Sequence, residues 1–147
     1  LSAVTDGLRV DMTSGNPDID CLGLLYLAYG PPTNTPWRRY PVDPSKIVNS
    51  KMLGEPVSGL DGTLKRYLDA SLLRPGDVLY LLIEGYEIPD DPLLITETAK
   101  YWPWHTALYV GGAEHTVIHA EPGGVVRKQS LESMQFDALF VTRLARP

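Results

Sequence analysis

The sequence predicts an α+β protein in which helices come first and antiparallel strands follow. Two observations predict this class. Apolar residues recur at helical spacing over residues 20–30 and 63–73. From residue 77 onward the pattern changes to short apolar or alternating runs separated by turns that contain Gly and Pro. We therefore expect the helices to pack on one face of an antiparallel sheet.

The first helix is expected to begin near Asp20 and to end by Gly30. Asp is a favoured capping residue, Gly suits the position past a helix end, and Pro31 and Pro32 prevent continuation. Residues 31–44 contain five prolines in fourteen residues, which predicts an extended and irregular segment. A weakly structured stretch is expected to continue to Gly62.

The second helix is expected over residues 63–73, followed by the terminating sequence Arg-Pro-Gly. Its apolar residues at helical spacing are Leu64, Tyr67, Leu68 and Leu72. Beyond it, residues 84–104 form a long segment that we expect to be an irregular insert. The strands are expected at 77–83, 105–110, 115–120, 124–129 and 138–145.

Composition bounds the class of protein. The chain of 147 residues fits one domain, and its 44% apolar and 21% charged residues are typical of a globular fold. The net charge of −5 comes without a basic cluster, which argues against nucleic acid and anionic lipid as partners. No run of 18 apolar residues occurs, so membrane insertion is not expected. The single cysteine cannot form an internal disulfide, and the cellular location stays unknown at this point.

Cys21, at the start of the first expected helix, has two interpretations. On a helix it shares a side with Leu24, Leu25 and Ala28, so its thiol points inward. Free cysteines are often buried core residues. However, the positive end of a helix dipole favours a thiolate and lowers the pKa of a cysteine in the first turn.

Two histidines on neighbouring expected strands favour the second interpretation. His105 shares a strand face with Ala107 and Tyr109, and His119 shares one with Val117. Because a short turn joins the two strands, the histidines can come within hydrogen-bond reach. A thiolate, an imidazole base and a second imidazole that orients the base form the triad of a cysteine hydrolase. The roles fall to Cys21, His105 and His119.

Four blocks in this order resemble the NlpC/P60 cysteine peptidases: DIDCLGLLYLAYG, LRPGDVLYL, HTALYVGG and VIHAEPGGVV. The resemblance implies a papain-like α+β fold, with a nucleophile helix packed on a central antiparallel sheet of five or six strands. It implies cleavage of amide bonds in peptidoglycan stem peptides, often between γ-D-glutamyl and a diamino acid, without a cofactor or metal. It assigns Cys21 as nucleophile, His105 as base and His119 as the third residue. A secreted, periplasmic, cell-envelope or phage-tail context is expected.

The chain departs from the family pattern in three places. No aromatic residue precedes Cys21, although the family usually has a Tyr there, and Leu22 and Ala107 replace the usual Ser and Gly. The single expected domain, 1–147, also carries inserts near 31–62 and 84–104. Such long segments beside a site often act as lids or binding surfaces, which could include a surface for a protein partner.

Other candidate residues have a functional and a structural interpretation. Asp20, Trp102 and Trp104 are candidates for substrate binding, although Asp20 can cap its helix and tryptophans beside prolines commonly anchor loops, as for Trp37. Asp77 follows Pro-Gly, which favours a turn that begins a strand over a catalytic acid. A metal site from His105, His115 and His119 lacks supporting ligands. Backbone N–H groups at the helix start, including that of Cys21, would form the oxyanion site.

Two alternatives to hydrolysis stay open. The same fold can serve as a binding or assembly module without turnover, for example in a phage tail, because fold does not determine function. Acyl transfer through the same cysteine and histidines is the other.

Overall fold

The computed structural model describes residues 43–120 and 126–144. The expected helix over 20–30, including Asp20 and Cys21, and residues 31–42 of the proline-rich segment lie outside the described residues. The elements are helix α3 (Pro44–Ser50) and strands β1 (Glu55–Leu64), β2 (Val78–Glu84), β3 (Leu94–Ile95), β4 (Lys100–Gly111), β5 (Thr116–Ala120), β6 (Val126–Ser130) and β7 (Ala138–Arg143). Single 3₁₀ turns occur at η2 (Lys65–Tyr67), η3 (Ala70–Leu72) and η4 (Leu131–Ser133).

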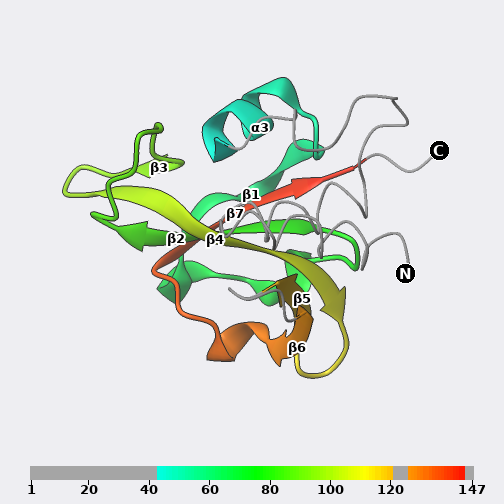
Figure 1. The fold of residues 1–147 in the computed structure, drawn as a ribbon. Helices are drawn as coiled ribbons and strands as arrows, with labels where there is room; N and C mark the ends of the chain where they lie inside the picture. The colour runs from blue at the N-terminus through cyan, green and yellow to red at the C-terminus, as the bar shows by residue number, and fades with distance from the viewer. Residues whose placement is uncertain (1–42, 121–125, 145–147) are drawn as a thin grey trace.

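The described strands form one sheet, in the order β1-β7-β2-β4-β5-β6 with β3 paired to β4 (Figure 1). All of these pairs are antiparallel. The α+β class and the antiparallel sheet are therefore confirmed. The sheet has seven strands, and the strand beyond the expected five or six is the two-residue β3.

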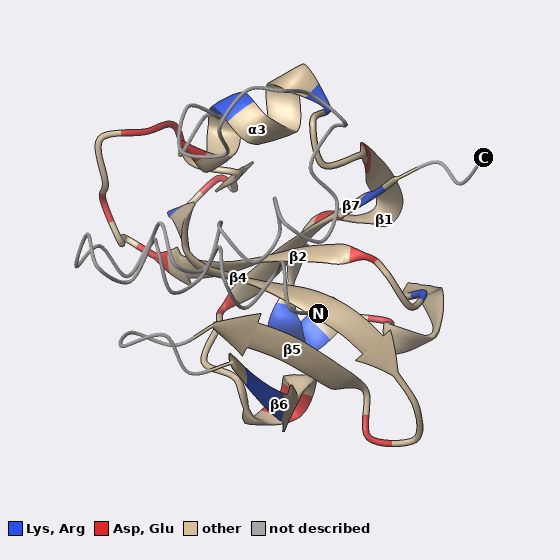
Figure 2. Ribbon diagram, turned by 45° about the vertical axis from the view of Figure 1, so that its right-hand side comes forward, with Lys and Arg blue, Asp and Glu red and all other residues tan. Residues whose placement is uncertain are grey.

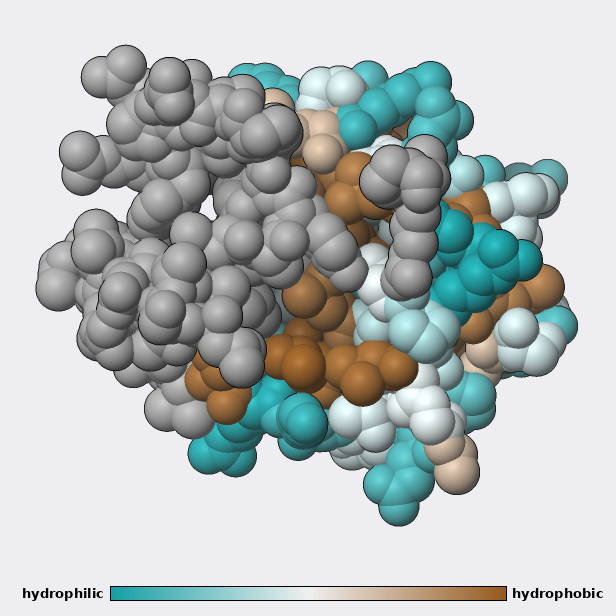
Figure 3. All heavy atoms as spheres, turned by 90° about the vertical axis from the view of Figure 1, so that its right-hand side faces the viewer, coloured by the Kyte–Doolittle hydropathy of each residue, from teal (hydrophilic) through white to brown (hydrophobic). Residues whose placement is uncertain are grey.

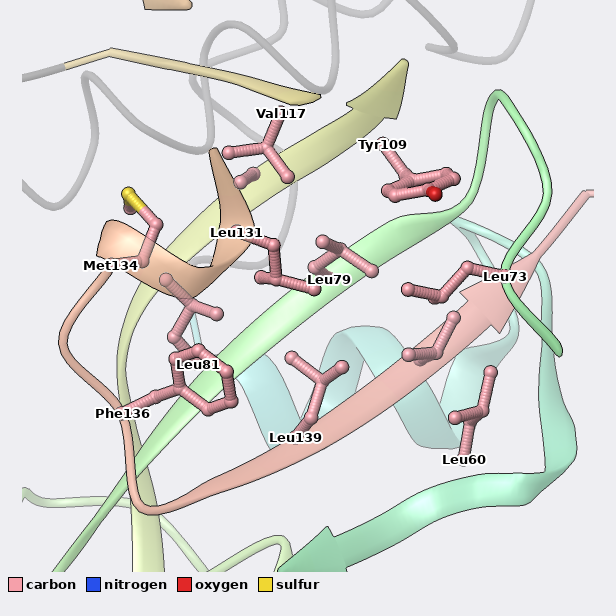
Figure 4. Close-up of a cluster of buried hydrophobic side chains, with 12 residues drawn as sticks. Leu60, Leu73, Leu79, Leu81, Tyr109, Val117, Leu131, Met134, Phe136 and Leu139 are labelled. Carbon is pink, nitrogen blue, oxygen red and sulfur yellow. The ribbon is translucent and has the colours of Figure 1, made fainter. Parts of the chain in front are cut away.

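Side chains cover both faces of the centre of the sheet. On one face α3 places Ile47 and Val48 against alternate residues of β2, including Tyr80. On the other face Leu79 and Leu81 pack among residues from β5, β7 and the η4 turn (Figure 4). Because β2 is buried on both faces, its sequence is a continuous apolar run and does not alternate with polar residues.

The helix expected over 63–73 is wrong. Leu64 ends β1 and pairs with Ala138, and only the single turns η2 and η3 follow. The apolar residues of the expected helix do not form one buried side, because Leu64 and Leu68 pack against different core clusters and Tyr67 is 69% exposed. The Asp69 carboxylate accepts a hydrogen bond from Ser71 N, a local pairing that competes with helix propagation.

The stretch before Gly62 is also more regular than expected. Pro44 begins α3 at a position that tolerates its missing N–H, and Lys51 ends the helix in the left-handed region with φ 59°. Strand β1 follows. Its pairing with β7 contains two register shifts, and Gly59 and Gly62 both have positive φ. These irregularities remove the alternation by which a strand is recognised.

The irregular segment expected over 84–104 ends earlier, because β4 begins at Lys100. Tyr101 and Trp102 pair with Glu84 and Ile83 of β2. Pro103 lies at the register shift of the β2–β4 pair, where a missing N–H is tolerated.

Charge and hydropathy differ across the surface. Strand β5 carries no Lys, Arg, Asp or Glu, whereas its neighbour β6 carries Arg127 and Lys128 (Figure 2). Hydrophobic side chains reach the surface on one side of the molecule (Figure 3). Within the described residues, no helix is both long and apolar enough to cross a bilayer.

Candidate active site

The site is built on a pair of histidines in neighbouring strands. His105 of β4 and His119 of β5 are 8% and 3% exposed. His105 Nε2 lies 2.9 Å from His119 Nδ1, and the rings meet edge to face with an interplanar angle of 88°. The expected contact between these two residues is confirmed. Cys21, the third expected member, is outside the described residues.

The strand register brings the histidines together. Tyr109 pairs with Val117 and Leu108 with Ile118 across the β4–β5 ladder. Continuing this register places His119 opposite Ala107, one step along the same face from His105.

A bulge in β4 adds Trp104 to the same site. His105 pairs with Leu81 and Pro103 with Leu82, so Trp104 is the extra residue on β4. Such a bulge can direct two consecutive side chains to one face. The Trp104 indole accordingly stacks on the His105 ring, with centroids 5.0 Å apart, and donates from Nε1 to the Gln135 carbonyl at 2.7 Å.

Gln129 of β6 completes the described part of the site. Its Oε1 lies 2.9 Å from His119 Nε2, and its Nε2 donates to the Ser133 carbonyl at 3.4 Å. Sequence reasoning missed this residue. The alternation of side chains along β6 could have found it. Gln129 lies directly opposite Val117, which shares a sheet face with His119, so Gln129 lies on that face as well.

Burial governs the electrostatics of the pair. Burial, with a smaller contribution from the neighbouring His119, lowers the pKa of His105 from 6.5 to about 4. His105 is therefore neutral near neutral pH, the state that can accept a proton. In the β5–β6 pair, the charged residue opposite His119 is Arg127, and its side chain is exposed.

The remaining sequence candidates separate from the histidine pair. Trp102 donates from Nε1 to the Asp90 carbonyl at 2.9 Å, which anchors the loop before β4. It also lines a cavity of about 490 Å³ with Glu84 and Lys100, and neither site histidine lines this cavity. Of the two tryptophans, only Trp104 reaches the pair.

Asp77 has the expected position at a turn that begins β2, and it also makes an ion pair. Its fully buried carboxylate accepts from Arg74 N at 2.8 Å and from Arg143 Nε and Nη2 at 2.6 and 2.8 Å. This arrangement joins the start of β2 to the end of β7. Asp77 is therefore structural, as expected.

His115 lies in the β4–β5 turn, where its Nδ1 is 2.6 Å from the Tyr109 hydroxyl. It does not join the pair formed by His105 and His119. In residues 43–120 and 126–144, no cluster of three or more His, Cys, Asp or Glu side chains is arranged to hold a metal ion.

The fold and site define an α+β protein with a buried pair of imidazoles on its sheet, of which His105 is neutral near neutral pH. Chemically, such a pair can accept a proton at one ring while the other ring holds it in place. Comparisons with protein-family models, with curated proteins and with solved structures find no match.

Proposed function

We propose that the protein is a cysteine peptidase or amidase of the NlpC/P60 type with a papain-like fold, which hydrolyses amide bonds in peptidoglycan stem peptides. The bond between γ-D-glutamyl and the diamino acid is the proposed target. The observation that carries the proposal is the buried contact of 2.9 Å between His105 and His119. A base and its orienting group are the parts of a thiol hydrolase that the sheet must supply.

In the proposed reaction the Cys21 thiol gives its proton to His105, and the thiolate attacks the substrate carbonyl carbon. Backbone N–H groups at the start of the expected helix stabilise the oxyanion. The C–N bond then breaks, and the leaving amine takes the proton from His105. Water attacks the resulting thioester, His105 accepts its proton, and that proton returns to the Cys21 sulfur as the acid leaves.

Two further observations support the proposal. Burial lowers the pKa of His105 to about 4, so the ring is unprotonated near neutral pH and can accept a proton, and a Cys21 thiolate beside it would favour the protonated ring and raise this pKa. The Trp104 stack covers one face of this ring and restricts its rotation. An unprotonated and fixed imidazole is what the proposed reaction requires of His105.

Digestion of purified peptidoglycan tests the proposal, with the fragments identified by mass spectrometry. The unmodified protein should release peptides with new γ-D-glutamyl termini, and Cys21→Ala and His105→Ala should not. His115→Ala is the matched control, because His115 bonds to Tyr109 outside the pair and its loss should leave release intact. A folded, unmodified protein that releases no fragment, or only binds the wall, would overturn the hydrolase proposal.

Thiol labelling gives an independent measure. At mildly acidic pH, Cys21 should react with iodoacetamide faster than a free cysteine, because a thiolate is the reactive form. His105→Ala should slow this reaction. Labelling at the rate of a free thiol would contradict an activated nucleophile.

A further inference from the structure

Gln129 is a polar side chain outside the expected triad, and it forms a hydrogen bond with His119. It stands on β6, at the far side of His119 from His105. Its own orientation depends on the η4 turn, where Leu131 is buried in the core and Ser133 donates from Oγ to the Ser130 carbonyl at 2.7 Å. The Ser133 carbonyl therefore lies at a defined place beside Gln129.

A carbonyl oxygen only accepts hydrogen bonds, so the amide end of Gln129 that faces Ser133 must be the NH₂ group. The opposite orientation would set the Gln129 oxygen against the Ser133 oxygen. This leaves Oε1 toward His119 Nε2 at 2.9 Å. Since Oε1 is an acceptor, His119 Nε2 must carry a proton.

In a neutral imidazole only one nitrogen carries a proton. In the neutral form of His119, Nδ1 is an acceptor, and its partner at 2.9 Å, His105 Nε2, must donate. The same rule applied to His105 leaves its Nδ1 unprotonated. The lone pair of the histidine pair that can accept a proton is thus on His105 Nδ1.

We propose that Gln129 is a positioning residue that sets both tautomers, so that His105 presents Nδ1 as the basic atom. This inference rests on the proposed function for its purpose, since a thiol hydrolase needs one basic nitrogen directed at its nucleophile. A wrong tautomer in a catalytic triad leaves the geometry intact but places a proton where the lone pair is needed.

Nitrogen NMR of protein labelled at histidine tests the inference near neutral pH, because long-range correlations distinguish the two tautomers. The chain has three histidines, and a His115→Asn variant assigns the signal outside the pair. In the unmodified protein, His105 and His119 should both be protonated at Nε2. A His119 ring protonated only at Nδ1 in the unmodified protein would overturn the inference.

Substitution at Gln129 then tests the cause. Gln129→Met keeps the length but removes the acceptor, so both histidines should lose the single Nε2-protonated form and show mixed tautomers. Gln129→Glu places a carboxylate beside His119 Nε2, which favours a His119 ring protonated on both nitrogens; its Nδ1–H should then donate to His105 Nε2 and leave the His105 proton on Nδ1. Gln135→Met is the matched control, because the contact of Gln135 with Trp104 uses its backbone carbonyl. Unchanged tautomers in a folded Gln129→Met protein would refute the role.

The outcome is separable from the proposed function. If the Nε2-protonated forms depend on Gln129 but no wall peptide is released, the positioning role stands and the hydrolase proposal fails. If peptides are released by a protein with other tautomers, the reverse holds. Should Gln129→Met fail to fold, the tautomers of the unmodified protein and of Gln129→Glu still decide the question.

Discussion

The indole of Trp104 lies against the imidazole of His105, with 5.0 Å between the ring centroids and 25° between the ring planes. The two residues are consecutive in sequence, and only the bulge in β4 lets them share a face of the sheet. The indole contributes to the burial that keeps His105 neutral.

Trp104→Leu should therefore raise the pKa of His105 from about 4 toward 6.5, because water gains access to the ring and solvates its charged form. An NMR titration of the His105 signals measures this. Trp102→Leu is the control, since that indole bonds to Asp90 in the loop before β4. An unchanged His105 pKa in a folded Trp104→Leu protein would show that the stack does not control it.

Stability should depend on pH through His105. Folding lowers the pKa of His105 from 6.5 to about 4, so between these values the unfolded chain binds more protons than the folded one. The free energy of unfolding therefore falls as the pH drops through this window, by about 3 kcal/mol from this group. Between pH 6.5 and 4, the free energy of unfolding measured with urea should fall by about 3 kcal/mol more in the native protein than in His105→Gln. Parallel pH profiles would contradict the shift.

The ion pair of Asp77 and Arg143 should matter to folding and not to the histidine pair. Asp77→Asn leaves Arg143 without its carboxylate, and we expect the free energy of unfolding to fall by roughly 2–3 kcal/mol. Glu55→Gln is the control, because the Lys51–Glu55 pair is exposed and should contribute nothing measurable. Chemical denaturation checks both variants. Equal unfolding midpoints for Asp77→Asn and Glu55→Gln would contradict the structural role of Asp77.

Two buried threonines form a matched pair for a test of hydrogen bonding. Within the described residues, Thr106 Oγ1 has no hydrogen-bond partner, while Thr142 Oγ1 donates to the Leu53 carbonyl at 2.8 Å. Thr106→Val should raise the free energy of unfolding by about 1 kcal/mol, because it removes an unpaired buried hydroxyl. Thr142→Val should lower it by a similar amount. Calorimetry of both variants measures these changes. Changes in the free energy of unfolding that have the same sign, or the opposite signs to those expected, would contradict the prediction.

Local pattern was sufficient for β2, β5, β6 and β7, for the second half of β4 and for the pairing of the histidines. Alternation along 105–110 and 115–120, with a short Gly-containing turn between them, predicts that His105 and His119 share a face. The structure has this contact. The α+β class could be predicted from the same change of period.

Local pattern failed where pairing with distant residues decides the structure. Leu64 belongs to a run of apolar residues at helical spacing, yet it pairs in the sheet with Ala138, which lies far along the chain. The Pro103 ring argues against a strand until a bulge in the β2–β4 ladder accommodates it.

The sequence by itself determined the α+β class and the residue types of the site, because side-chain periodicity is a local property. Only the tertiary structure decided that Trp104 covers His105 and that Gln129 bonds to His119. The first depends on one extra residue in β4, and the second on the register of β6 against β5. Register and bulges arise from contacts between strands, and these contacts form only when the sheet is assembled.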